Sequence, residues 1–366
     1  MSTRTPITIV VVGLVLAACG GGATTGTTAT TATTTTPSTT STTEATPDTL
    51  TIISHDSFAG GVTDETFAAF TADTGIGVEV LPAGDGGSLV NQAILTKDNP
   101  VADVLFGVDN TFLSRALDEG LFVPYTSSRL SDVPGDLQVD SEHRVTPIDR
   151  GDVCLNYDLS TFAGNTPPPL NLEQLTNPEY DNLLVVENPA TSSTGLAFLL
   201  STIAAFGEDG WQDYWKSLVD NGVRVVADWD TAYYSEASWW GGDRPIVVSY
   251  ASSPPAEVIY ADPPIDHAVT GVVDEGCYGQ IEFAGILSGT PYEAAAGKLI
   301  DFMLSPAFQE TVPLTWFVFP ANTTVALPEA FVKYTTEPAH PNRLDPALVE
   351  ANRDRWISEW TQIVAP

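Results

Sequence analysis

The sequence predicts an α/β fold made of two lobes that close on a small molecule. Three observations predict it. Apolar, strand-like runs alternate with helix-like segments from about residue 49, a second such block starts near residue 150, and 366 residues suffice for one large bilobed unit. Alternating strands and helices favour a largely parallel sheet covered by helices. A ligand in such a sheet binds at the carboxyl ends of the strands.

The composition indicates a globular protein with an acidic surface. Hydrophobic residues make up 43% of the chain, and 14 basic against 47 acidic side chains give a formal charge of −33. Such a surface repels phosphate backbones, so we expect no nucleic-acid partner. Most of the excess acid is interpreted as solvated surface that favours solubility, although it also suits a cationic ligand.

Residues 1–18 are typical of a lipoprotein signal peptide. Arg4 is the only charge before a short apolar run at residues 7–16, which is too short to span a bilayer. The run ends in LAACG at residues 16–20, which resembles the bacterial lipobox, where cleavage precedes a cysteine that is then acylated. We therefore expect Cys19 to be lipidated. The lipid would hold the protein at the cell membrane on its extracytoplasmic face, in the periplasm or on the cell exterior.

Residues 19–48 are expected to form a flexible tether after the lipidated cysteine. From residue 20 they are nearly all Thr, Ala, Gly, Ser and Pro, and they offer little apolar surface to offset the entropy of ordering. With Cys19 set aside, Cys154 and Cys277 remain. Two cysteines in an oxidising compartment most simply form one disulfide, although the sequence cannot show that they come within bridging distance.

The first block, residues 49–149, is predicted to belong to lobe 1. Thr63 followed by two acidic residues is a helix-start pattern, and Gly75 is typical of a helix end. The expected elements are a strand at 50–53, a helix from 63 to about 75, a strand at 76–81, a helix from 88, a strand at 103–108 and a helix at 110–118.

The second block, residues 150–280, is predicted to form lobe 2, and residues 281–366 to return to lobe 1 and end in helices. The Pro- and Asn-rich segment 161–180 is interpreted as a surface connection with one short helix. The expected strands are at 152–157, 183–187, 223–227, 245–250 and 278–286, and the expected helices at 196–206, 211–219, 231–239, 292–304 and 346–364.

Several stretches, in order along the chain, resemble the thiamine-binding periplasmic proteins of bacterial ABC transporters. They are HDSFAGG at 55–61, AGDGGSLVNQ at 83–92, ADVLFGVDN at 102–110, NPATSSTGLAFLL at 188–200, ADWDTAYY at 227–234, VVSYASSP at 247–254, FMLSPAFQETVP at 302–313 and RWISEWTQ at 355–362. The resemblance implies the two-lobed type II periplasmic-binding-protein fold with a ligand cleft between the lobes. In this fold the chain crosses the hinge at least twice.

The resemblance also implies what the protein does. We expect a non-enzymatic, monomeric binder without a cofactor, a metal or catalytic residues. It would capture thiamine, thiamine monophosphate or thiamine diphosphate and deliver it to an ABC-transporter permease in the membrane.

Ten positions are carried over as candidate ligand contacts. They are Asp85, Gly86, Ser192, Ser193, Trp229, Tyr250, Ala251, Ser252, Ser253 and His55. Trp229 and Tyr250 offer π faces to the thiazolium cation of thiamine, each worth about 0.5–2 kcal/mol. Asp85 suits the exocyclic amine or the positive charge. His55 stands where the family commonly has tyrosine, so its contact with the ligand is left open.

Each candidate also has a purely structural interpretation. Trp229 would serve as a core aromatic, Asp85 as the cap of a helix near residue 88, and Tyr250 as packing at the end of a strand. The serine pairs 192–193 and 252–253 would cap the helices that follow them. Helix N-termini also suit phosphate, which is why phosphorylated thiamine is expected as a ligand.

Two alternative functions stay open. The pair Tyr233–Tyr234 resembles the iron ligands of ferric-ion-binding proteins with the same fold. A thiaminase I-like enzyme would use Cys154 as a nucleophile, which requires a free thiol. The sequence holds no P-loop, no G-x-S-x-G elbow, no dinucleotide fingerprint and no metal-binding motif.

Overall fold

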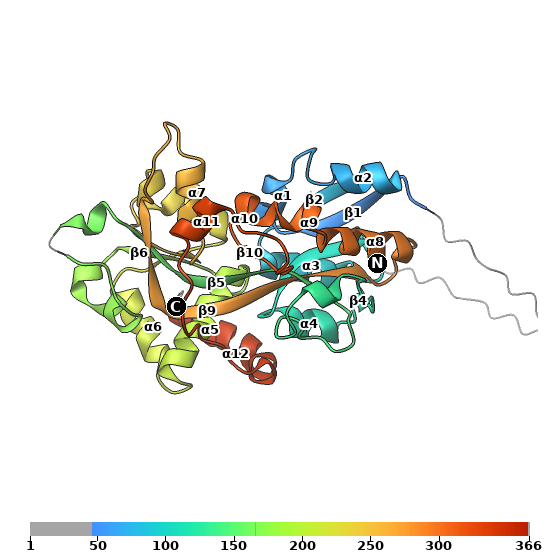
Figure 1. Ribbon diagram of the computed structural model, residues 1–366. Coiled ribbons are helices and arrows are strands. Elements are labelled where there is room, and N and C mark those ends of the chain that lie inside the picture. The colour runs from blue at the N-terminus through green and yellow to red at the C-terminus, as the bar shows by residue number, and fades with distance from the viewer. Residues whose placement is uncertain (1–45, 165, 365–366) are drawn as a thin grey trace, which may run out of the picture. The chain divides into compact units, whose positions relative to one another are not determined.

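The structure, a computed structural model, describes residues 46–164 and 166–364 (Figure 1). The predicted signal peptide, the lipidation site at Cys19 and most of the tether lie outside these residues. All described residues belong to one compact unit. Within this part of the chain, no helix combines the length and the apolar character needed to cross a membrane.

A mixed sheet organises the described residues. Its ten strands are β1 (Thr49–Ser54), β2 (Gly77–Pro82), β3 (Val104–Asp109), β4 (Phe122–Val123), β5 (Thr146–Asp158), β6 (Leu184–Glu187), β7 (Arg224–Val226), β8 (Ile246–Tyr250), β9 (Thr270–Leu287) and β10 (Phe319–Pro320). The main order is β2-β1-β3-β9-β5-β8-β6-β7, with β10 paired to β5 and β4 to β9. The sheet therefore joins strands from both sequence blocks.

Parallel strands lie at both ends of this order, and two long antiparallel strands lie between them. Strand β1 pairs in parallel with β2 and β3, and β6 pairs in parallel with β7 and β8. Strands β5 and β9 pair antiparallel with each other, and they also pair antiparallel with β8 and β3. The predicted largely parallel sheet is thus correct for the outer strands and wrong for the centre.

The two central strands are longer than the sequence predicted. Strand β5 starts at Thr146 and β9 at Thr270, whereas strands were expected only at 152–157 and 278–286. Pro147 and the glycine-containing run 271–276 concealed the extra length, since these residue types usually interrupt strands. Both predicted lobe boundaries, at 149/150 and 280/281, fall inside these strands, and the division at those residues stays a prediction.

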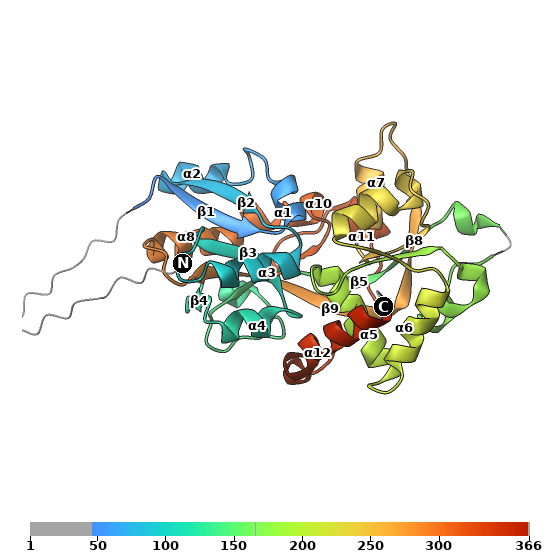
Figure 2. The ribbon, with the colours of Figure 1, turned by 180° about the vertical axis from the view of Figure 1, so that it is seen from behind.

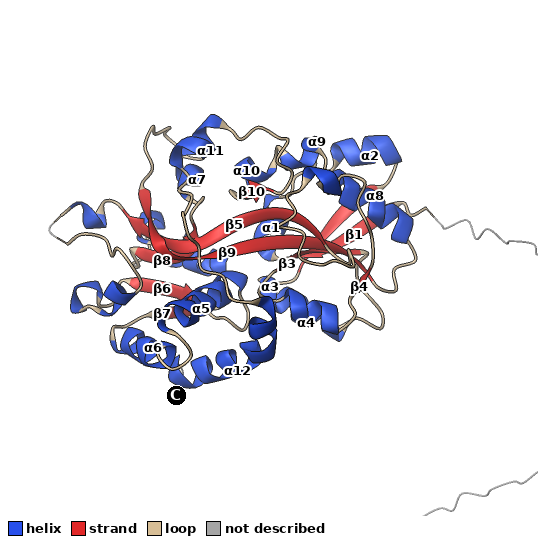
Figure 3. Ribbon diagram, turned by 60° about the horizontal axis from the view of Figure 1, so that its bottom comes forward, coloured by secondary structure: helices blue, strands red, loops and turns tan. Residues whose placement is uncertain are grey.

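Helices lie on both faces of the sheet (Figures 1 and 3). They are α1 (Asp56–Gly61), α2 (Ala68–Thr74), α3 (Gly86–Leu95), α4 (Leu113–Asp118), α5 (Ser193–Phe206), α6 (Trp211–Asp220), α7 (Pro254–Ile259), α8 (Glu293–Met303), α9 (Pro306–Gln309), α10 (Val312–Thr315), α11 (Glu329–Tyr334) and α12 (Pro346–Val364). Most predicted helices are confirmed within a few residues. The short helices α1, α9, α10 and α11 were not predicted.

Two segments differ in kind from the prediction. Where a helix was expected at 231–239, the chain forms a π-helical turn at Thr231–Glu236 and a 3₁₀ turn at Ser238–Trp240. The segment 161–180 contains three short 3₁₀ helices instead of one helix. Tertiary packing decides both segments, because each buries aromatic side chains such as Tyr233 and Tyr180.

The last helix, α12, packs against α6 and also touches α4 (Figure 2). Its apolar face was predicted at Trp356, Trp360 and Ile363, and both tryptophans are buried. The ring of Trp360 meets the ring of Trp215 on α6 edge to face, with centroids 5.4 Å apart. This contact links the end of the chain to the second sequence block.

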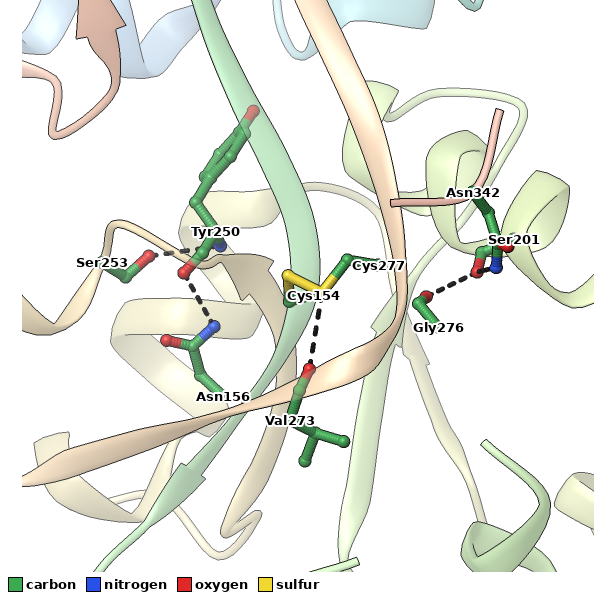
Figure 4. The surroundings of a disulfide bond; sticks show 9 residues. All are labelled: Cys154, Asn156, Ser201, Tyr250, Ser253, Val273, Gly276, Cys277 and Asn342. Carbon is green, nitrogen blue, oxygen red and sulfur yellow. Dashed lines mark hydrogen bonds between the residues drawn. A yellow bond between two sulfur atoms is a disulfide. The ribbon is translucent and has the colours of Figure 1, made fainter. Parts of the chain in front are cut away.

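Cys154 and Cys277 form a disulfide that joins β5 to β9 (Figure 4). Their Cα atoms are 4.4 Å apart, and both residues are buried. Beside the bond, the side-chain amide of Asn156 donates to the carbonyl of Tyr250 at 3.0 Å. The ring of Tyr250 points away from the disulfide (Figure 4). The disulfide therefore lies close to the backbone of Tyr250, one of the candidate ligand contacts.

Replacing both cysteines with serine should lower the free energy of unfolding. A disulfide that closes a loop of 123 residues restricts the unfolded chain, and its loss typically costs about 2–5 kcal/mol. Urea unfolding followed by tryptophan fluorescence measures the change. A reductant should destabilise the wild type to a similar degree and leave the double variant unaffected. An unchanged urea midpoint for the wild type after both thiols become titratable would contradict the structural role.

Candidate functional site

A pocket of about 410 Å³ is lined by residues from both sequence blocks. This volume is within the range of small-molecule sites. Its aromatic lining consists of Phe58, Phe106, Trp229, Tyr233, Tyr234, Trp240, Tyr250, Tyr260, Trp316 and Phe317. Its carboxyl groups belong to Asp56, Asp85, Asp149, Asp230 and Glu282. Rings and negative charges thus surround one cavity, a combination that suits a flat organic cation.

Asp85 combines the two roles that the sequence left open. One carboxylate oxygen accepts the Gly86 N–H at 2.6 Å and caps α3, while the other accepts the backbone N–H of Trp229 at 3.1 Å. Burial raises the pKa of the Asp85 carboxyl above its ordinary value, although hydrogen bonds from Ser192 and Gly86 and the charge of His55 oppose the shift. Asp85 therefore ties the second block to the start of α3 and still lines the pocket.

Trp229 is held in a cluster of aromatic rings. Its ring stacks on Tyr233 with centroids 4.8 Å apart, and its indole N–H donates to the Ser249 hydroxyl at 2.9 Å. The ring of Tyr250 lies 6.3 Å away at an angle of 59°. Because Tyr233 covers one face of the indole, only the opposite face is available to a ligand.

The start of α5 supplies Ser193 and Thr194 to the pocket lining. Ser192 is fully buried, and its hydroxyl accepts the Gly195 N–H at 3.3 Å, so it caps the helix. The beginning of α3 lies directly against this region. A β-carbon added at Gly86 would lie 1.9 Å from the Ser193 hydroxyl oxygen. Glycine at 86 therefore leaves room for the Ser193 side chain where the two helix N-termini approach each other.

The strand-end cluster divides in the structure. Tyr250 and Ser253 line the pocket, and the Ser253 hydroxyl accepts the Tyr250 N–H at 3.2 Å. Ala251 is buried against the disulfide, and Ser252 is buried as well. Of the ten predicted contacts, six line the pocket. The other four, Gly86, Ser192, Ala251 and Ser252, are buried and are not among the lining residues.

His55 enters the pocket beside two carboxyl groups that the sequence did not single out. Its Nδ1 accepts the Phe58 N–H at 3.2 Å, so a proton on Nε2 faces Glu282, whose oxygen lies 3.4 Å away. Glu282 on β9 is directly opposite Asp149 on β5 in the antiparallel register. A β-carbon at Gly107 would lie 2.2 Å from the imidazole, so this glycine makes room for the ring.

Burial and neighbouring charges shift the pKa values of Asp149 and His55. Burial raises the pKa of Asp149 well above its ordinary value, and the negative charge of Glu282 raises it further. Burial alone would lower the pKa of His55, but Glu282, Asp85 and Asp230 together raise it. A signal was present in the sequence for Glu282, which is a single acid within the otherwise apolar segment 281–287, but Asp149 stands beside Arg150 and Asp152 and gave none.

One tyrosine of the pair named for iron binding, and the cysteine named for the enzyme, are already engaged. The Tyr233 hydroxyl donates to Glu257 at 2.6 Å, and Tyr233 is buried. Cys154 is disulfide-bonded and therefore has no free thiol to act as a nucleophile. Over residues 46–164 and 166–364, no group of three or more His, Cys, Asp or Glu side chains could hold a metal ion.

Comparisons with known proteins agree with this geometry. Residues 99–345 match the family described as bacterial extracellular solute-binding protein. Over 319 residues the chain is 32% identical to the thiamine-binding periplasmic protein of Escherichia coli (strain K12), which covers 86% of this chain and 93% of that protein. A solved periplasmic thiamin binding protein is similar, with a TM-score of 0.77, 29% identity, and coverage of 87% and 96% of the two chains.

Iron-bound HitA from Pseudomonas aeruginosa is also similar, with a TM-score of 0.71, 19% identity, and coverage of 87% of this chain and 99% of that one. At this identity the likeness shows the fold alone. Together, these similarities confirm the two-lobed periplasmic-binding-protein fold and the resemblance that the sequence motifs predicted.

Replacing Gly86 with alanine should weaken both the fold and the site. The new methyl group has no room beside Ser193, and overpacking of this kind costs about 1–3 kcal/mol. Thermal unfolding and ligand titration measure the two effects. Gly135→Ala is the matched control, since nothing lies within 4 Å of a β-carbon there. Equal stability and affinity for the two variants would contradict the required close approach.

The ligand-free protein should be more stable at pH 5 than at pH 8. Burial is the main cause that raises the pKa of Asp109 from 3.8 to about 7, and of Glu257 from 4.5 to about 7. Between the ordinary and raised values the folded state binds more protons than the unfolded state, so the free energy of unfolding falls as pH rises. Thermal unfolding across this pH range tests the sign.

The variant Asp149→Asn provides the internal check on this pH dependence. It should raise the unfolding temperature more at pH 8 than at pH 5, because the amide carries no charge to bury. Asp213, on α6, is exposed and gives the control variant Asp213→Asn. This variant should leave the unfolding temperature unchanged at both pH 5 and pH 8. An unfolding temperature that rises steadily from pH 5 to pH 8 in the wild type would contradict the role given to these buried acids.

Proposed function

Because this chain belongs to the bacterial extracellular solute-binding proteins, and among them to the group of the thiamine-binding periplasmic proteins, we propose that it captures thiamine for uptake by an ABC transporter. The observation that supports the proposal most is the shared pocket of Asp85, Trp229 and Tyr250. These are the three side chains whose chemistry most directly matches a flat, permanently charged vitamin.

The proposed binding mode follows from the chemistry of the two ring systems of thiamine. The thiazolium cation stacks on the open face of Trp229 and meets Tyr250, and each contact contributes about 0.5–2 kcal/mol. The exocyclic amine of the aminopyrimidine donates to Asp85. Asp149 and Glu282 line the same pocket, and a bound cation favours the charged form of these carboxyl groups, so that they offset its charge.

Closure of the lobes is proposed to complete the pocket. Hydrogen bonds already connect the blocks, among them one from the Trp229 N–H to Asp85 at 3.1 Å and one from the Tyr260 hydroxyl to the Leu314 carbonyl at 2.9 Å. We expect these bonds to form as the lobes close on the ligand and to break as they open. The protein then acts as a binder that carries its ligand unchanged.

The cellular setting is proposed from the sequence. A lipid on Cys19 and the tether 19–48 hold a monomer at the extracytoplasmic face, where it delivers its ligand to an ABC-transporter permease. Thiamine monophosphate and thiamine diphosphate are proposed as further ligands.

Trp229→Ala should weaken thiamine binding about tenfold or more, equal to at least about 1.4 kcal/mol. The variant loses a π face for the cation, and calorimetry measures the affinity. Phe206→Ala is the matched control, because Phe206 also stacks on a tyrosine, Tyr214 at 4.2 Å, but lies outside the pocket. It should lose stability and keep its affinity.

Two results would contradict the proposal at different levels. Unchanged thiamine affinity in Trp229→Ala would remove this residue from the site. Absence of heat or fluorescence change when the wild type meets thiamine at micromolar concentrations would contradict the function itself. A coloured complex with ferric ion under those conditions would favour the alternative of iron binding.

A further inference from the structure

We infer that Glu257 is a positioning residue for the proposed thiamine site, because it holds the ring of Tyr233 against the indole of Trp229. This inference rests on the proposed function and adds to the same site a residue that lies outside the pocket lining. Two features carry it: a chain of contacts from α7 to the indole, and a carboxyl group that serves this chain best in its ionised form.

The chain of contacts begins at the carboxyl group of Glu257, which is buried on α7. One carboxyl oxygen accepts the hydroxyl of Tyr233 at 2.6 Å, and the other accepts the hydroxyl of Thr270 at 2.6 Å. The first donor lies in the π-helical turn Thr231–Glu236 and the second on β9. Two donors from separate elements therefore fix the orientation of this carboxyl group, and the carboxyl group in turn fixes the Tyr233 hydroxyl.

The ring of Tyr233 passes this constraint on to Trp229. The two rings are stacked, with centroids 4.8 Å apart and an angle of 18° between their planes. Tyr234 and Tyr250 meet the indole at 81° and 59°, so they do not support its face in this way. Because Tyr233 covers the rear face of the indole, a shift of its ring displaces the surface on which a cation would stack.

The other contacts of Trp229 hold different parts of the residue. Its indole N–H donates to the Ser249 hydroxyl at 2.9 Å, and its backbone N–H donates to Asp85 at 3.1 Å. These bonds fix one edge of the ring and the main chain. The tilt of the ring face depends on the stacked Tyr233, and therefore on the hydrogen bond to Glu257.

The direction of this hydrogen bond follows from the environment of Tyr233. Burial raises the pKa of its hydroxyl well above the ordinary value, and the negative charge of Glu257 raises it further, so the hydroxyl keeps its proton and donates. An ionised carboxylate accepts at both oxygens, whereas a protonated one carries a hydrogen on one of them. Hydrogen bonds to a charged acceptor are also stronger than those to a neutral one. The ionised form of Glu257 therefore holds Tyr233 more firmly.

The charge of Glu257 changes near neutral pH. Burial is the main cause that raises the pKa of Glu257 from 4.5 to about 7, although hydrogen bonds from Thr270 and Tyr233 oppose the shift. A ligand that binds best to the ionised form lowers this pKa when it binds. The contribution of Glu257 to affinity is then present above the raised pKa and is lost as the pH falls below it.

The groups around α7 are engaged elsewhere or keep their charge state in this range. Burial would raise the pKa of Asp158 on β5, but hydrogen bonds from two serines hold it below its ordinary value. Burial raises the pKa of Tyr234, so its phenol stays neutral. On α11, which packs against α7, the Lys333 ammonium donates to the Tyr334 hydroxyl at 2.7 Å, and Glu329 is exposed. Glu257 is therefore the group whose charge changes behind the aromatic stack.

Calorimetry with thiamine between pH 5.5 and pH 8 tests the inference on the wild type and Glu257→Gln. The amide is uncharged at every pH, so the two proteins should bind thiamine equally, within about twofold, at pH 5.5. At pH 8 the wild type should bind at least about threefold more tightly, because only it has the charge-assisted bond to Tyr233. Equal affinities at pH 8, or one constant ratio at every pH, would overturn the inference.

Thermal unfolding at pH 8 separates positioning from a merely structural role. The unfolding temperature of Glu257→Gln should not fall below that of the wild type, because the amide carries no charge to bury. Weaker binding together with undiminished stability is the expected result. A loss of both would show that Glu257 only maintains the fold and would overturn the inference. Glu329→Gln, at the exposed position on α11, is the control and should keep both wild-type values.

Tyr233→Phe tests whether Glu257 acts through the tyrosine hydroxyl. It keeps the stacked ring, and it should weaken binding at pH 8 about as much as Glu257→Gln, whereas the double variant should lose little more. Additive losses would overturn the route through Tyr233. Tyr214→Phe is the matched control, because Tyr214 also stacks on a ring and donates to the Leu172 carbonyl at 2.8 Å, but lies outside the pocket. If Glu257→Gln does not fold, Tyr233→Phe and the wild type should show the same growing gap from pH 5.5 to pH 8.

Tryptophan fluorescence of the ligand-free protein keeps this inference distinguishable from the proposed function. The wild type should show a change centred near pH 7 that Glu257→Gln lacks, since the raised pKa of Glu257 is about 7. If thiamine does not bind at any pH, the proposed function fails, while this titration still reports whether Glu257 positions Trp229. If thiamine binds and the two proteins differ neither in fluorescence nor in the pH dependence of affinity, only the positioning role fails.

Discussion

The site depends on two acids, Asp149 and Glu282, that face each other on adjacent strands in the middle of the sheet. Burying two neighbouring carboxyl groups is unfavourable unless one is protonated or a positive charge lies nearby. In the ligand-free pocket, His55 is the nearest group that can supply such a charge. A cationic ligand supplies this charge when it binds. Binding then relieves the unfavourable burial of the two acids, and this relief favours binding of the vitamin.

The rest of the fold holds this pair and the rings around it in position. Strands β5 and β9 carry the two acids, and the bond between Cys154 and Cys277 joins the same strands farther along. Next to β5, β8 delivers Tyr250. Asp85 binds the backbone of Trp229, so the start of α3 and the aromatic cluster are positioned together. Stability and ligand geometry therefore depend on shared contacts.

Local sequence patterns predicted most of the longer helices and the outer strands, and the family resemblance pointed to ten candidate contacts, six of which line the pocket. They could not predict the central antiparallel pairing, because register between β5 and β9 joins residues more than a hundred positions apart. The pairing of Asp149 with Glu282 was missed for the same reason. Ala251 and Ser252 were expected in the pocket, but the tight turn after Tyr250 buries both. Whether the chain carries a lipid at Cys19 lies outside the described residues.

The most direct test of the account is the number of protons exchanged when thiamine binds, measured by calorimetry in buffers of different ionisation enthalpy. A cation placed beside Asp149 and His55 lowers the pKa of both groups. Binding between pH 6 and pH 8 should therefore release protons to the buffer. Binding that takes up protons, or exchanges none across this range, would contradict the claim that the ligand's positive charge compensates these buried acids.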